Sequence, residues 1–80
     1  MTNDEIITKI REYLKWSHNS DKEITITDRL KEDLELDSID IIELTLEIEQ
    51  AFNMRIPDNE IEYCKTVKDL LNSIHKYERT

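Results

Sequence analysis

No glycine occurs among the 80 residues of this chain, and its absence restricts the folds and activities open to it. Glycine is the residue that readily adopts positive φ angles and lets a backbone approach a ligand closely. The dinucleotide-binding fingerprint, the Walker A loop and the nucleophile elbow all require it at defined positions. Enzymes that depend on such loops are therefore excluded, and we expect one domain over residues 1–80.

The charge balance excludes further classes of function. The chain has 19 acidic and 11 basic residues, a net charge of −8, which disfavours nucleic acid and anionic membranes as partners. Cys64 is the only cysteine, so no disulfide can form within the chain. No apolar run is long enough for a membrane span, and residues 1–5 are acidic where a signal peptide is basic. We expect a monomeric, cytoplasmic protein.

Apolar residues recur with helical spacing in four segments. The pattern predicts helices over about 3–16, 38–52 and 66–77, and a short one over 58–63. Three helix starts carry capping residues, namely Thr2 with Glu5, Asp37 with Asp40, and Thr66 with Asp69. The predicted fold is all-α, a small four-helix bundle with a long first loop and a short third helix.

Residues 22–36 are predicted to form the long loop. The piece 23–27 alternates like a strand, but one short strand would have no partner here. We expect the loop to be fixed to the core by spaced apolar side chains: Ile24, Ile26, Leu30, Leu34 and Leu36.

The negative charge is concentrated in one part of the chain. Residues 35–62 hold nine acids and a single base, Arg55, so this segment alone carries the whole excess of −8. Most acidic runs are simply solvated surface. Here, however, the run coincides with a helix that has apolar residues on two sides.

The predicted helix over 38–52 has a core face and a second apolar face. At 100° per residue the core face comprises Ile41, Leu44, Ile48, Ala51 and Phe52. Nearly opposite lie Ile39, Ile42 and Leu46, flanked by acidic and amide side chains. An exposed apolar stripe bordered by acids suits docking of a basic partner. Alternatively, Ile39 and Ile42 pack under the long loop and only Leu46 is exposed.

A motif at the start of the same helix resembles the acyl carrier proteins of fatty acid and type II polyketide synthesis. Asp37-Ser38-Ile39 is similar to the Asp-Ser-Leu triplet of that family. Ile56-Pro57-Asp58 and Thr66-Val67 follow in the family's order and spacing, so the likeness covers nearly the whole chain.

The resemblance implies a non-catalytic carrier rather than an enzyme. A phosphopantetheinyl transferase would attach 4′-phosphopantetheine from coenzyme A to Ser38, with Asp37 and Ile39 beside it, and the thiol would carry acyl groups as thioesters. Acyl-processing enzymes with basic docking patches would bind one face of the helix. That face is Asp40, Ile42, Glu43, Leu46, Glu49 and Gln50.

Two positions depart from the family pattern. Most members have glycine three residues before the serine, where this chain has Glu35, and many have an acid where it has Gln50. The alternative function is an unmodified acidic helical adaptor that keeps the fold without the prosthetic group.

Other candidate sites are weaker. Residues 33–44 begin like a calcium-binding loop, but Ser38 and Leu44 occupy the positions of the turn glycine and the bidentate glutamate, so no metal site is predicted. Ser38 with a histidine and an aspartate lacks an oxyanion hole, so no catalytic site is predicted. Cys64 is expected in the core, and Tyr13 and Trp16 are expected to be packing residues.

Overall fold

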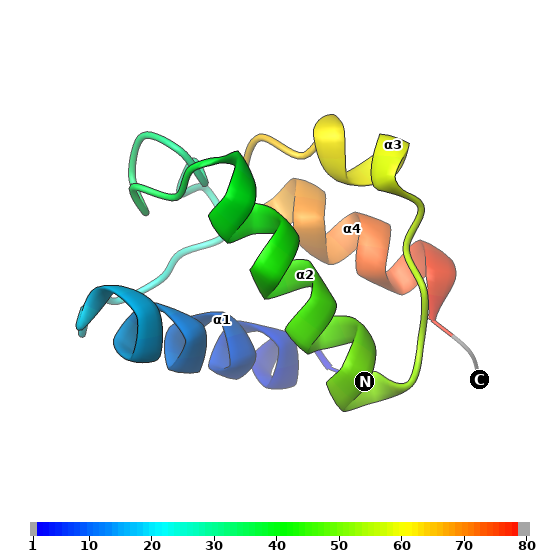
Figure 1. The fold of residues 1–80 in the computed structure, drawn as a ribbon, viewed down its shortest axis with the longest axis horizontal. Coiled ribbons are helices and arrows are strands. Elements are labelled where there is room, and N and C mark those ends of the chain that lie inside the picture. The colour runs from blue at the N-terminus through cyan, green and yellow to red at the C-terminus, as the bar shows by residue number, and fades with distance from the viewer. Residues whose placement is uncertain (1, 79–80) are drawn as a thin grey trace.

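The computed structural model describes residues 2–78, which form four helices and, within that range, no strand longer than an isolated bridge. The helices are α1 (Asn3–His18), α2 (Ser38–Phe52), α3 (Asp58–Glu62) and α4 (Val67–Tyr77) (Figure 1). α2 packs against both α1 and α3, and α3 packs in turn against α4. The prediction of an all-α, four-helix bundle with a long first loop and a short third helix is confirmed.

Capping boxes define where the three long helices begin. In each box the N-cap side chain accepts the backbone N–H of the third helical residue, whose own side chain accepts the N-cap N–H. The pairs are those predicted: Thr2 with Glu5, Asp37 with Asp40, and Thr66 with Asp69.

The helix ends differ slightly from the predictions. α1 continues two residues beyond the expected end and stops at Asn19, which has φ 51°. α2 ends at Phe52, as predicted, and its C-cap Asn53 also has a positive φ, of 52°. Asparagine tolerates this left-handed conformation better than most residues, so the two positions act as C-caps without glycine. α3 ends one residue early, and Thr66 caps α4 rather than belonging to it.

The long loop is held by backbone hydrogen bonds to the start of α4. The N–H groups of Val67 and Lys68 donate to the carbonyls of Asp28 (2.9 Å) and Ile26 (2.9 Å). The N–H of Leu30 donates to the carbonyl of Lys65 (2.8 Å). The bonds from Val67 and Lys68 satisfy first-turn donors of α4 that have no partner within the helix. The loop therefore does have a partner, and the expectation that Ile26 anchors it is wrong, because that side chain is 45% exposed.

One core joins the helices and the loop. Ile6 and Ile10 of α1, Leu44 of α2 and Leu70 of α4 have no exposed surface. The loop contributes the other expected anchors, Ile24, Leu30, Leu34 and Leu36, all of them buried.

Two further packing expectations are wrong. Ala51, placed on the core face of α2, is exposed, whereas Ile41, Leu44 and Ile48 are buried and Phe52 is partly buried. Trp16 is 77% exposed, although its neighbour Tyr13 is buried as expected. Cys64 is buried, as predicted.

Glu35 takes up a left-handed backbone conformation, with φ 56°. It lies between the buried side chains of Leu34 and Leu36, and the N–H of Leu36 donates back to the carbonyl of Leu30 (3.0 Å). The sharp change of direction at residue 35 therefore closes the loop just before α2. A residue with a Cβ atom adopts this conformation only at an energetic cost.

Candidate functional site

The candidate site is built on the N-terminus of α2. The Asp37 carboxylate accepts the N–H of Asp40 (2.8 Å), and the Asp40 carboxylate accepts the N–H of Asp37 (3.1 Å). This second bond is the largest cause of the lowered pKa of Asp40. Ser38 follows as the first helical residue and is exposed. Within residues 2–78 no hydrogen bond engages its side chain, so the hydroxyl is available to react.

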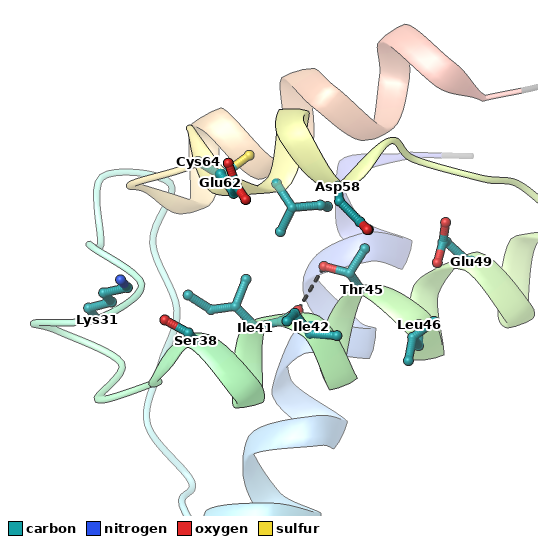
Figure 2. A pocket seen from close by; sticks show the side chains of 11 residues that line it. Lys31, Ser38, Ile41, Ile42, Thr45, Leu46, Glu49, Asp58, Glu62 and Cys64 are labelled. Carbon is teal, nitrogen blue, oxygen red and sulfur yellow. Dashed lines mark hydrogen bonds between the residues drawn. The ribbon is translucent and has the colours of Figure 1, made fainter.

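Ser38 opens onto a groove between α2 and α3, the α2–α3 groove, with a volume of about 380 Å³. Its apolar walls include Ile41 and Ile61, and Cys64 also lines it. Figure 2 shows Lys31 and Ser38 at one end of this groove and Glu49 and Asp58 at the other. A volume of this size is at the lower end of the range for small-molecule sites.

The second apolar face of α2 is exposed. The side chains of Ile39, Ile42 and Leu46, here called the α2 stripe, are 65%, 54% and 50% exposed. The alternative in which Ile39 and Ile42 pack under the loop is therefore wrong. Ile42 and Leu46 also border the α2–α3 groove, whereas Ile39 does not line it.

A polar cluster joins α1 to the start of α2. The hydroxyl of Tyr13 lies 3.3 Å from Oδ1 of Asp40 and 3.2 Å from Oε2 of Glu43. Nε2 of His18 lies 3.2 Å from Oδ2 of Asp40. Burial is the main cause that raises the pKa of Tyr13 to about 12, and the neighbouring carboxylates add to it. Asp40 and Glu43 are thus held in place by α1. Both carboxylate oxygens of Asp40 are engaged in these contacts and in the capping box, whereas the cluster engages only Oε2 of Glu43, which is exposed.

The remaining predicted partner residues differ in their availability. Glu49 is partly buried, and its Oε2 accepts the N–H of Ile56 at 2.7 Å. This bond stabilises the segment that follows α2, so Glu49 has a structural role that sequence reasoning missed. Gln50 is exposed.

Other groove residues were also missed by the sequence analysis. Thr45 is buried in the wall of the α2–α3 groove. Its hydroxyl is satisfied there because it donates to the carbonyl of Ile41 (2.7 Å). Asp58 and Glu62 lie across the groove on α3. A helical threonine four residues after a carbonyl can always form such a bond, but nothing local indicates which α3 residues face it.

Residues 2–78 contain no group of three His, Cys, Asp or Glu side chains placed to hold a metal ion. Over the same range, each helix is too short or too polar to cross a bilayer.

Comparison with known proteins gives consistent matches over nearly the whole chain. Residues 4–74 match the family model described as "Phosphopantetheine attachment site". The chain is 47% identical to an acyl carrier protein of Borrelia garinii subsp. bavariensis, covering 95% of this chain and 96% of that protein. It is 38% identical to an acyl carrier protein of Rubrobacter xylanophilus, covering 98% of each.

A solved structure agrees with these matches. The acyl carrier protein of Thermotoga maritima superposes with a TM-score of 0.81 at 33% identity. The superposition covers 92% of this chain and 87% of that one.

Proposed function

The chain belongs to the acyl carrier protein family, and from this premise we propose that Ser38 is the residue that bears its prosthetic group. The group is 4′-phosphopantetheine. We propose that its thiol supplies the chemistry by holding acyl groups as thioesters. We further propose that residues 1–80 act as one carrier domain, because the helices and the long loop share one core.

The observation that carries the proposal is the position of Ser38. Its hydroxyl is exposed, free of hydrogen bonds within the described residues, and at one end of the α2–α3 groove. On attachment the hydroxyl oxygen of Ser38 forms a phosphoester bond to the phosphorus of coenzyme A that bears the pantetheine. The pyrophosphate bond of coenzyme A breaks, adenosine 3′,5′-bisphosphate leaves, and the hydroxyl gives up its proton to the transferase or to solvent. The groove leads away from Ser38 along apolar side chains, so the residues present fit a long, flexible group.

The electrostatics indicate that the covalent bond, rather than charge attraction, must hold the phosphate. Helix N-termini favour anions, but here the carboxylates of Asp37 and Asp40 already occupy the first turn. Lys31 is the only basic residue among those lining the groove, and it lies at the same end as Ser38. A phosphate at Ser38 therefore has one cation and two carboxylates as neighbours.

We propose that the α2 stripe and its acidic neighbours form the face that binds acyl-processing enzymes and the transferase. Ile39, Ile42 and Leu46 supply the apolar contact, and Asp40 and Glu43 supply charge for a basic patch. Whether the carrier serves fatty acid synthesis or polyketide synthesis depends on which enzymes bind this face.

Intact mass spectrometry tests the attachment site. The protein is incubated with coenzyme A and a phosphopantetheinyl transferase, and we expect the mass of one phosphopantetheine to be added. Ser38→Ala should gain nothing, whereas the control Ser17→Ala, which removes an exposed serine from α1, should be modified like the wild type. Modification of Ser38→Ala would refute the assignment. A wild type that is never modified would instead favour the unmodified adaptor.

The docking face has a separate test. Glu43→Lys should weaken binding to the transferase, and more so at low salt because the attraction is screened less. Glu23→Lys makes the same charge change at an exposed position of the long loop that lines neither groove, and serves as the control. Equal losses in the two variants, or a loss independent of salt, would contradict the proposed face.

A further inference from the structure

The indole of Trp16 is exposed in a way that the carrier function does not explain. It is 77% exposed near the C-terminal end of α1, and it is the only tryptophan of the chain. Its ring lies 6.1 Å from the buried ring of Tyr13, at an interplanar angle of 49°. The indole is therefore positioned by a rigid neighbour while most of its surface faces solvent.

Trp16 borders a second groove, the α1–α2 groove, with a volume of about 360 Å³. Lys9, Glu12, Tyr13 and Trp16 line it from one face of α1, and Glu47 lines it from α2. The Lys9 ammonium lies 3.8 Å from a Glu12 carboxylate oxygen, and both side chains are largely solvated. Such an exposed pair is weak, so Glu12 can exchange this partner for another cation.

The α1–α2 groove is continuous with the proposed docking face. Tyr13 lines the groove, and its hydroxyl lies within hydrogen-bond distance of Asp40 and Glu43 of α2. Glu47 belongs to the groove and is next to Leu46 of the α2 stripe. A partner lying on α2 would therefore reach the groove without leaving the acidic surface.

We propose that the α1–α2 groove binds an arginine side chain of the partner protein, and that the docking face thereby extends from α2 onto α1. The proposal rests on the carrier function, because it takes the partner to be a protein with a basic docking patch. Trp16 supplies the flat surface on which the guanidinium stacks, and Glu12 and Glu47 supply carboxylates at its edge.

The chemistry of the groove favours arginine over lysine. A guanidinium is planar and weakly hydrated, so it stacks on an indole and donates to carboxylates through several N–H groups at once. An ammonium is compact and strongly hydrated, and it gains less from an aromatic face. Tyr63 is equally exposed, at 78%, but it lines neither groove and offers a matched comparison.

Binding of two short peptides tests the proposal directly. The probes are tri-arginine amide and tri-lysine amide, which carry the same charge, and binding is followed by Trp16 fluorescence and by the backbone amide shift of Glu47. We expect the arginine peptide to bind roughly two- to fivefold more tightly in the wild type. Trp16→Leu, followed by the amide shift alone, should bring this ratio close to one, and Tyr63→Leu should leave it unchanged.

Acidic variants test the second element of the groove. Glu47→Gln should weaken both peptides, whereas Glu62→Gln removes the same charge from α3 and should have little effect. Lys9→Gln should tighten binding, because it removes the cation that competes for Glu12. A wild-type ratio of one, a ratio that persists in Trp16→Leu, or equal effects of Glu47→Gln and Glu62→Gln would overturn the proposal.

The carrier function can fail independently of this result. Peptide binding requires no prosthetic group, so Ser38→Ala should bind both peptides like the wild type. Failure to modify Ser38 would therefore leave the groove intact as an arginine site. Conversely, a protein that is modified at Ser38 but shows no preference for the arginine peptide would refute only the proposal that the α1–α2 groove binds arginine.

Discussion

Replacing Glu35 with glycine should stabilise the protein. Glu35 has φ 56°, and of the three described residues with positive φ it is the only one that is not asparagine. A left-handed conformation costs a residue with a Cβ atom about 1–2 kcal/mol. Glycine avoids this cost but loses about 0.4–1 kcal/mol more conformational entropy on folding. We therefore expect Glu35→Gly to raise the free energy of unfolding by about 0.5–1 kcal/mol.

Urea unfolding followed by far-ultraviolet circular dichroism measures this change. The midpoint should move to higher urea at an unchanged m value, and the melting temperature should rise by about 2–8 °C for a domain of this size. Because Glu35 belongs to the acidic segment 35–62, removing its charge could also stabilise the fold. Glu35→Gln separates the two effects, since it removes the charge but keeps the Cβ atom.

The variants give distinct outcomes. Glu35→Gln should recover little of the gain, and Glu35→Asn should recover part of it, because asparagine tolerates positive φ. Glu23→Gly, at an exposed loop position where φ is not positive, should not stabilise the protein. If Glu35→Gln stabilises as much as Glu35→Gly, charge repulsion rather than backbone strain is the cause. A lower midpoint for Glu35→Gly would refute the reasoning altogether.

Three further predictions follow from burial and from shifted pKa values. Leu44→Ala should lower the free energy of unfolding by about 3 kcal/mol, because the side chain is fully buried, whereas Leu46→Ala on the same helix should cost less than about 1 kcal/mol; urea titrations compare the two. The pKa of Asp40 is lowered, chiefly by the N–H of Asp37, so its ionised form stabilises the fold above about pH 4 and this contribution is lost as the pH falls further. Asp40→Asn should flatten the pH dependence of stability below pH 4, and an unchanged slope would contradict the assignment. Burial raises the pKa of the Cys64 thiol, so iodoacetamide should alkylate it slowly at pH 8 in the folded protein and quickly in urea; equal rates would place the thiol at the surface.

Helix starts were predictable because the groups that form them are close in sequence. Each capping box joins residues three apart, so Thr2, Asp37 and Thr66 could be recognised as N-caps directly. The exposed face of α2 was predictable for the same reason, since the spacing of apolar residues along one helix determines which side each occupies.

Contacts between distant segments could not be predicted in this way. The bonds from residues 67 and 68 to the carbonyls of residues 28 and 26 depend on where α4 begins relative to the loop. The positions of Trp16 and of the Tyr13–Asp40–Glu43 cluster likewise depend on how α1 crosses α2. No periodicity within one helix contains that information, because a crossing is determined by packing over the whole core.

The acidic charge of α2 is divided between the fold and the surface. Three carboxylates accept a backbone N–H, namely those of Asp37, Asp40 and Glu49. These hydrogen bonds stabilise the start of α2 and the segment after it, so the three carboxylates are less available to a partner. Glu43 and Glu47 accept no backbone N–H within the described residues, and they flank the exposed α2 stripe on the side of α1. Charge reversal should therefore separate the two groups: at Asp37 or Glu49 it should lower stability, whereas at Glu47 it should leave stability nearly unchanged and reduce binding of a basic partner. The net charge of −8 thus overstates what a partner can use, and the side of α2 that faces α1 holds most of the carboxylates that remain free for binding.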